Sequence, residues 1–134
     1  MSSFGILIVD DHDVVRSSIR SILSSSECTI CGEACDGLEA VEKAISTRPD
    51  LVIMDVSMPR MDGVAATKII RTELPETQVI IISQNDPKLV AKQAAEVRAC
   101  GSLSKSDLGH ALLPLIQTLA KRKQLAFIDP ELRL

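Results

Sequence analysis

The amino-acid sequence predicts an α/β fold in which helices cover both faces of a single doubly wound, five-stranded parallel sheet. Two observations lead to this prediction. Short apolar runs alternate with helical patterns five times along the chain, which is the pattern of parallel strands joined by right-handed crossover helices. Three of the runs are apolar at four successive positions, as expected of strands that are buried between two helix layers.

The strand predictions follow from these apolar runs. The strongest strands cover residues 6–9, 51–54 and 79–82, and a polar residue follows each of them. Two weaker strands are predicted over residues 29–31 and 101–104, where the apolar pattern is less continuous. These five segments complete the predicted sheet.

Apolar residues spaced three and four positions apart predict helices between the strands. The five helices are expected over residues 14–23, 38–45, 64–74, 87–97 and 108–119. Pro49 and Pro75 bound the second and third helices, and Pro87 is a favoured first residue for the fourth. Pro114 lies inside the fifth pattern. Because proline removes a helix hydrogen bond, we expect a kink or a break there.

The length of 134 residues suits one domain. We expect this domain to span residues 1–122, with the basic stretch 121–123 at the exposed end of the last helix. Residues 123–134 are expected to form a C-terminal tail or the start of an interdomain linker. A new short helix is predicted to begin in that segment at Pro130.

Composition excludes several classes of function. The net charge is −3, with two Phe and no Tyr or Trp, so neither a basic nucleic-acid surface nor an aromatic base-stacking platform is expected. No apolar run is long enough to cross a membrane, and no basic segment precedes the first short one. We therefore expect a cytoplasmic protein that binds neither nucleic acid nor membrane directly.

Three of the four cysteines lie close together, and they raise the question of a metal site. Cys28, Cys31 and Cys35 fall within eight residues, whereas Cys100 is isolated. Zinc usually needs a second cluster of ligands. Reduced, structural thiols are therefore the better interpretation, in keeping with a chain that has enough apolar residues for a core.

Polar side chains with related chemistry follow four of the predicted strands. They are Asp10, Asp11, Asp55, Ser83 and Lys105. Ligands of an open parallel sheet bind beyond the carboxyl ends of its strands, so we expect these side chains to converge. Three carboxylates this close would resist ionising together, and a divalent cation such as Mg²⁺ removes that conflict. A lysine and a hydroxyl beside such a cation suit a phosphoryl group, and Asp55 is the candidate nucleophile.

At these positions the chain resembles the receiver domain of two-component response regulators. The resemblance covers residues 4–122 and includes Asp55 in the motif Asp-Val-Ser-Met-Pro-Arg-Met-Asp-Gly. Segments 11–16, 31–40 and 127–132 resemble the subfamily whose receivers precede a LuxR/NarL-type helix-turn-helix domain. The resemblance implies a flavodoxin-like sheet of strand order 2-1-3-4-5. It also implies a function in a phosphorelay, with control of an output partner or domain that regulates transcription.

The resemblance implies roles for individual residues. Asp55 would accept a phosphoryl group from a sensor histidine kinase, in a transfer that the domain itself catalyses without being an enzyme otherwise. Asp11, Asp55 and the backbone carbonyl of Ser57 would hold Mg²⁺, with Asp10 assisting. The phosphoryl oxygens would be bound by Ser83 and Lys105.

Three departures from the family pattern concern how phosphorylation is passed on. Ser102 stands where the family usually has an aromatic switch residue, Gln84 stands where a small residue usually follows the switch hydroxyl, and Ser106 stands where a proline often follows the lysine. We therefore expect an altered output face, and the family's usual homodimer is not assumed. Ser57 and Asn85 occupy positions that tune phosphate hydrolysis in the family.

Three other functions are alternatives to a receiver in a phosphorelay. A phosphorylation-independent pseudo-receiver would keep this fold as an interaction module. An aspartate-nucleophile phosphatase of the haloacid dehalogenase type would need a Thr or Ser that the segment Asp10-Asp11-His12-Asp13 lacks. Flavin binding would need a phosphate-cradling loop after the first strand, where acids stand instead. His12 is interpreted as a first-turn helix residue rather than a Mg²⁺ ligand.

Overall fold

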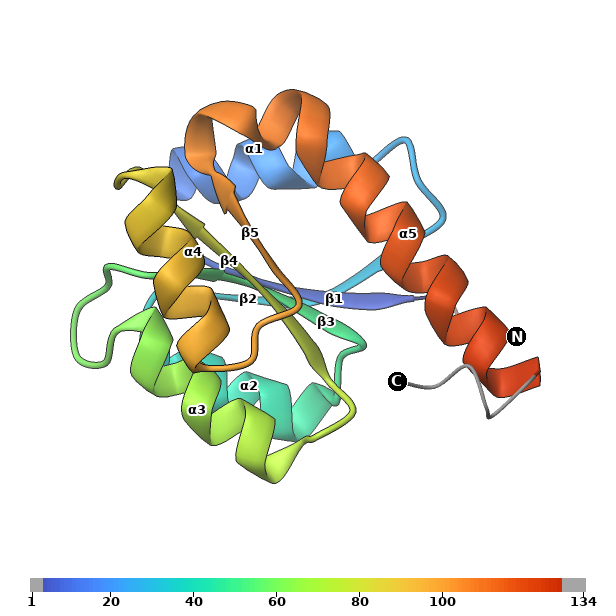
Figure 1. Ribbon diagram of the computed structural model, residues 1–134, viewed down its shortest axis with the longest axis horizontal. Helices are drawn as coiled ribbons and strands as arrows, with labels where there is room; N and C mark the ends of the chain where they lie inside the picture. Colours follow the sequence, from blue (N-terminus) through green and yellow to red (C-terminus); the bar gives the residue numbers. More distant parts are fainter. Residues whose placement is uncertain (1–3, 129–134) are drawn as a thin grey trace.

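The structure is a computed structural model that describes the backbone of residues 4–128 and the side chains of residues 4–123. Five parallel strands in the order β2-β1-β3-β4-β5 form one sheet between two helix layers (Figure 1). This architecture confirms the predicted fold class and strand order. The strands are β1 (Gly5–Val9), β2 (Thr29–Ala34), β3 (Leu51–Asp55), β4 (Gln78–Ser83) and β5 (Gly101–Ser104). The helices are α1 (Asp13–Leu23), α2 (Gly37–Thr47), α3 (Gly63–Glu73), α4 (Pro87–Glu96) and α5 (Leu108–Ile128), with a short 3-10 turn over Lys105–Asp107.

The sheet separates two hydrophobic cores. Along the central strands successive side chains alternate between them, because neighbouring residues of a strand point to opposite faces. Leu7 and Val52 belong to the core under α2, α3 and α4, whereas Ile8 and Ile53 belong to the core under α1 and α5. All four side chains are fully buried. Residues that are apolar at four successive positions are therefore needed to fill both faces at once.

Strand β2 is longer than the sequence indicated. It continues from the predicted 29–31 segment to Ala34, and its pairing with β1 shifts by one residue between Ile6 and Leu7. Because Glu33 is polar, the second half of the strand does not continue the apolar pattern from which strands are predicted. A polar side chain is accommodated at this position because β2 lies at the edge of the sheet. The Glu33 carboxylate forms ion pairs there with Arg16 and Arg20 of α1.

Helix α5 corrects the expectation for its interior and its end. Of the kink or break predicted at Pro114, the break is wrong, since one helix runs from Leu108 to Ile128 with Pro114 inside it, and the kink stays a prediction. The stretch 121–123 is also not the end of the helix, which continues for five more residues. The predicted short helix at Pro130 lies outside the described residues. None of the helices within residues 4–128 combines the length and apolar character needed to cross a bilayer.

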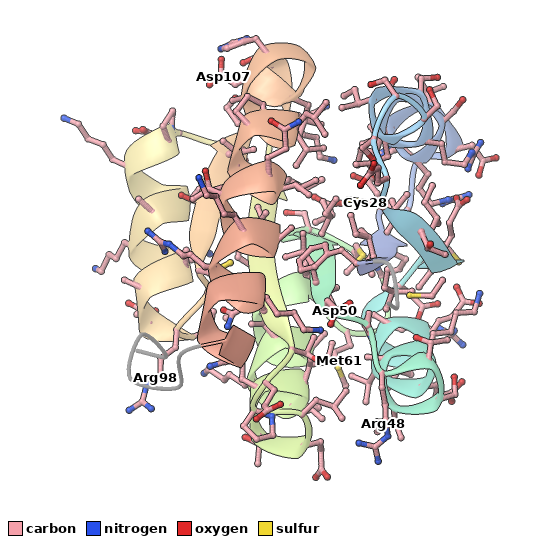
Figure 2. The ribbon with its side chains drawn as sticks, turned by 90° about the vertical axis from the view of Figure 1, so that its right-hand side faces the viewer. Cys28, Arg48, Asp50, Met61, Arg98 and Asp107 are labelled. Atoms are coloured by element: carbon pink, nitrogen blue, oxygen red, sulfur yellow. The ribbon has the colours of Figure 1, made fainter. Side chains whose placement is uncertain are left out.

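The second half of α5 is held against the end of the sheet where the strands begin. Figure 2 looks at that end, where Asp50 lies on the connection from α2 to β3. The Asp50 carboxylate accepts a hydrogen bond from the backbone N–H of Gly5 at 2.7 Å and forms an ion pair with Lys123. One aspartate therefore links β1, the start of β3 and the last turns of α5.

Replacing Pro114 with alanine is expected to stabilise the protein. The side chain of Pro114 is exposed, so no core packing is lost. Alanine restores a backbone donor inside α5, and a net intramolecular hydrogen bond contributes about 1 kcal/mol. Urea denaturation followed by far-ultraviolet circular dichroism measures the change in the free energy of unfolding. A lower free energy of unfolding for Pro114→Ala would show that α5 depends on the proline geometry.

Candidate functional site

The carboxyl ends of four strands carry the polar side chains singled out from the sequence. Asp10 directly follows β1, Asp55 ends β3, Ser83 ends β4 and Lys105 directly follows β5. The ends of β3 and β4 are joined where the N–H of Val56 donates to the carbonyl of Ile82 at 3.2 Å. The parallel order thus brings residues that are far apart in sequence to one edge of the sheet.

Lys105 forms the centre of this site. Its Nζ lies 2.7 Å from Oδ2 of Asp10 and 3.2 Å from Oδ1 of Asp55. Asp10 is fully buried, and Asp55 is 3% exposed. The predicted convergence is therefore found for these three residues. One ammonium group stands between two buried carboxylates, which leaves an excess of negative charge.

The acidity of Asp55 reflects this excess. Burial, followed by the charge of Asp10, raises the pKa of Asp55 from an ordinary 3.8 to about 6, although Lys105 opposes the rise. Burial alone would lower the pKa of Lys105, but its contacts with Asp10 and Asp55 hold that pKa above the ordinary value. The ammonium therefore stays charged at neutral pH, while Asp55 takes up a proton more readily than a free carboxylate.

Asp11 and His12 lie beside this buried group, at the surface. The imidazole Nδ1 of His12 is 3.1 Å from Oδ1 of Asp11 and 3.3 Å from Oδ1 of Asp10. The backbone N–H of His12 also donates to Asp10 Oδ1 at 2.9 Å. Among the described residues, Asp10, Asp11 and His12 are the one group of ionisable side chains close enough to share a metal ion. The three clustered cysteines do not form such a group, and all four cysteines are free thiols.

The donor set of the site fits Mg²⁺. The carboxylates of Asp10 and Asp11 offer oxygen ligands, which Mg²⁺ prefers over nitrogen, whereas the predicted ligand Asp55 falls outside the group of side chains that are close enough to share an ion. A single lysine does not balance three carboxylates, so a divalent cation would relieve their mutual repulsion. Ser57 lies two residues beyond Asp55 in an exposed part of the following loop, where its backbone carbonyl is a further candidate ligand.

The remaining residues predicted for the site lie on β4 and β5 and directly after β4. Ser83 is buried, and its Oγ accepts a hydrogen bond from the backbone N–H of Asn85 at 2.9 Å. Gln84 and Asn85 are exposed. Gln84 and Lys105 line a surface hollow of about 480 Å³ between α1 and the start of α5. Ser102 lies in the middle of β5 and is half-buried.

The loop from β3 to α3 is held at both ends. The N–H of Gly63 donates to the carbonyl of Val56 at 2.8 Å, and the N–H of Gly37 donates to the carbonyl of Met61 at 3.0 Å. Nε of Arg60 donates to Oδ2 of Asp36 at 3.0 Å. Arg60 has a φ of 65°, a left-handed conformation that costs energy for a residue with a side chain. These contacts fix the path of the chain just after Asp55.

Sequence reasoning missed the contribution of Arg16. This side chain extends from α1 to the end of β1, where Nη1 donates to the backbone carbonyl of Asp10 at 2.6 Å. In the sequence, Arg16 belongs to the segment 11–16 that resembles the receiver family, and no separate role is predicted for it. An arginine that follows an acidic pair by one and a half helical turns is a pattern that could have indicated this contact.

The pKa of Asp55 leads to a prediction about stability in the absence of metal. A carboxyl whose pKa is raised by folding binds its proton more tightly in the native state, so it destabilises the protein as the pH rises through that pKa. Asp55→Asn lacks this penalty. We expect the variant and the wild type to be similar near pH 4, and the variant to be more stable by about 2 to 3 kcal/mol near pH 7.

Urea denaturation in a chelating buffer, at several pH values, measures this difference. The effect should shrink when Mg²⁺ is added, because cation binding favours the ionised form of Asp55 in the native state. A difference in stability that does not change between the two pH values would contradict the raised pKa.

The open doubly wound sheet thus carries acids, a hydroxyl and a lysine at its carboxyl edge, the arrangement in which a phosphoryl-binding site is predicted. The profile of the response regulator receiver domain family matches residues 6–117. The chain belongs to this family, whose general function is to be phosphorylated by a kinase within two-component systems.

Individual relatives agree with this assignment. The chain is 36% identical to the transcriptional regulatory protein YhcZ of Bacillus subtilis strain 168, over 94% of this chain and 50% of YhcZ. It is 45% identical to protein-glutamate methylesterase/protein-glutamine glutaminase 1 of Methanosarcina acetivorans, over 78% of this chain and 30% of that protein. A LuxR-family two-component response regulator from Aurantimonas sp. SI85-9A1 has a similar structure, with a TM-score of 0.82, 30% identity and coverage of 90% and 86%. The chain thus spans half or less of the length of these two curated relatives.

Proposed function

We propose that Asp55 is the residue that accepts the phosphoryl group. The observation that carries this proposal is the position of Asp55 at the end of β3, nearly buried and 3.2 Å from Lys105 Nζ. A carboxylate is a competent nucleophile at phosphorus. Lys105 supplies part of the charge neutralisation that phosphoryl transfer requires, and a bound cation would supply more.

The proposed reaction is a transfer from a phosphohistidine of a sensor kinase. An oxygen of the Asp55 carboxylate attacks phosphorus, the phosphorus–nitrogen bond breaks, and the departing imidazole takes up a proton. In this proposal Lys105 neutralises a phosphoryl oxygen, and the hydroxyl of Ser83 donates a hydrogen bond to another. Bound Mg²⁺ would supply further neutralisation of the phosphoryl charge, held by Asp10, Asp11, Asp55 and the Ser57 carbonyl.

The proposed partners are a sensor histidine kinase and an output domain or protein. Transcriptional regulators among the relatives support an output that controls transcription. The proposed compartment is the cytoplasm, where the four free thiols would stay reduced. The domain would catalyse its own phosphorylation and dephosphorylation and carry no other enzymatic activity. A homodimer is one form that the output could take.

A second candidate function is that of a pseudo-receiver that works without phosphorylation. Two observations favour keeping it in view. Ser102 stands at the middle of β5 in place of an aromatic switch residue, and Gln84 is a large exposed side chain next to Ser83. Both belong to the face that would pass on the phosphorylated state.

Intact-mass measurement separates these two functions. The protein is incubated with a small phosphoryl donor such as phosphoramidate, in Mg²⁺ and in chelator. The expected result is a gain of one phosphoryl group when Mg²⁺ is present with the donor, and no gain when the chelator is present. Beryllium fluoride, which mimics an acyl phosphate, provides a second test if the phosphorylated form is short-lived. Failure of both the mass gain and beryllium fluoride binding would overturn the proposal in favour of the pseudo-receiver.

A further inference from the structure

We infer that Arg16 is a positioning residue for the acidic pair, and that it sets the affinity of the site for Mg²⁺ without touching the cation. This inference rests on the proposed function of the site. Its basis is a set of contacts that converge on one partly buried guanidinium group, which is 16% exposed and connects α1, β1 and β2.

Arg16 holds the peptide group between Asp10 and Asp11. Strand β1 ends at Val9, but the N–H of Asp10 continues the ladder by donating to the carbonyl of Ala34 at 3.1 Å. The carbonyl of Asp10 receives its hydrogen bond from Nη1 of Arg16 instead, at 2.6 Å. The Arg16 side chain thus supplies the hydrogen-bond donor that the backbone of a neighbouring strand would otherwise supply to this carbonyl.

The Arg16 hydrogen bond orients the peptide group from which Asp11 continues. The carbonyl of Asp10 and the N–H of Asp11 belong to the same planar peptide unit. A hydrogen bond that fixes the carbonyl therefore fixes the plane and the position of the Asp11 Cα within it, so that only rotation about the Asp11 N–Cα bond is left to set where the side chain leaves the backbone. Asp11 is at the surface, where nothing in the core constrains it. The Arg16 contact holds the peptide group that carries this exposed ligand beside the buried Asp10, and the Asp11 carboxylate itself lies 3.1 Å from His12 Nδ1.

The contacts of Arg16 depend on the planar shape of its guanidinium group. All three nitrogens of its guanidinium group are used: Nη1 binds the Asp10 carbonyl, Nε binds Glu33 Oε1 at 3.1 Å, and Nη2 binds Asp13. Lysine carries the same charge but has a single, flexible ammonium group that cannot reproduce this planar fork. Charge and geometry can therefore be separated by one substitution.

The chain also provides a matched control. Arg20 lies one turn further along α1 and donates to the same Glu33 Oε1 at 2.6 Å. It has no contact with Asp10 among the interactions of the described residues. Arg20→Lys removes a guanidinium from the same carboxylate as Arg16→Lys does, but leaves the Asp10 carbonyl bonded.

The test compares wild type, Arg16→Lys and Arg20→Lys. Mg²⁺ affinity is measured by calorimetry, and phosphorylation by phosphoramidate is timed at saturating Mg²⁺. Loss of an outer partner of a metal ligand typically weakens metal binding 10- to 100-fold, so we expect about a tenfold higher Kd for Arg16→Lys. Its phosphorylation rate at saturating Mg²⁺ should stay within about twofold of wild type, as for a change confined to binding. Arg20→Lys should match wild type in both.

A readout in the metal-free protein makes the test independent of the proposed function. The carbonyl carbon resonance of Asp10 should shift in Arg16→Lys and not in Arg20→Lys, and circular dichroism checks that both variants are folded. An unshifted Asp10 resonance in Arg16→Lys, or equal Mg²⁺ affinity in both variants, would overturn the inference. Wild-type protein that binds no Mg²⁺ would instead overturn the proposed function, and the role of Arg16 toward Mg²⁺ with it.

Discussion

Replacing Asp55 with asparagine is expected to abolish phosphorylation. The amide has almost the shape of the carboxyl group, so the end of β3 should stay intact, but its oxygen is a poor nucleophile. It also carries no charge to attract a cation. Incubation with phosphoramidate and Mg²⁺ should add one phosphoryl group to the wild type and none to the variant, as measured by intact mass.

A matched control lies in the loop that follows. Asp62 is exposed and caps α3 by accepting a hydrogen bond from the N–H of Ala65 at 2.8 Å. Asparagine is an equally good N-cap, so Asp62→Asn should fold and be phosphorylated like the wild type. Phosphorylation of Asp55→Asn at the wild-type rate would show that another residue is the acceptor.

Replacing Gly63 with alanine is expected to cost at least about 3 kcal/mol of stability, the upper end of the usual effect of overpacking. A Cβ at this position would lie 1.9 Å from the backbone carbonyl oxygen of Asp55 and 2.8 Å from its carbonyl carbon. Backbone atoms cannot rotate away as the end of a side chain can. The substitution therefore has to move either α3 or the residue that carries the proposed chemistry.

Gly109→Ala is the control for this experiment, because the sign of its effect should be opposite. Gly109 lies near the start of α5, and a Cβ there would meet nothing within 4 Å. Alanine in a helix is favoured over glycine by about 0.5 to 1 kcal/mol. Urea denaturation followed by circular dichroism compares both variants with wild type. Equal stability of Gly63→Ala and wild type would mean that the loop after Asp55 has room to adjust.

The sheet and the buried members of the site could be predicted because their residues carry strong local patterns. Apolar runs of four residues occur where strands are covered on both faces, and each is followed by the polar residue that the parallel order brings to one edge. Asp10, Asp55 and Lys105 meet as a direct consequence of that order. A coarse reading of strand ends is therefore sufficient to locate the centre of the site.

Other features depend on contacts that no local pattern records. The second half of β2 was missed because Glu33 is polar, and its position depends on two arginines of α1. The predicted helix over 108–119 already included Pro114, where Leu112 and Ile116 pack against the sheet on either side of the proline, but the apolar spacing ends at Leu119 and so did not indicate the extension of α5 to Ile128. The contact of Arg16 with Asp10 joins a helix face to a strand end, and spacing alone does not show which way a long side chain turns.

The continuity of α5 also limits the physical means by which phosphorylation can influence the chain beyond the domain. The helix starts three residues after Lys105 and has 21 residues, so its two ends are about 30 Å apart. Salt screens exposed charges over about 8 Å under physiological conditions. A phosphoryl charge on Asp55, the proposed acceptor, would therefore scarcely be felt as an electric field at residue 128. An influence over that distance has to be mechanical, through a shift or rotation of the helix as a rod.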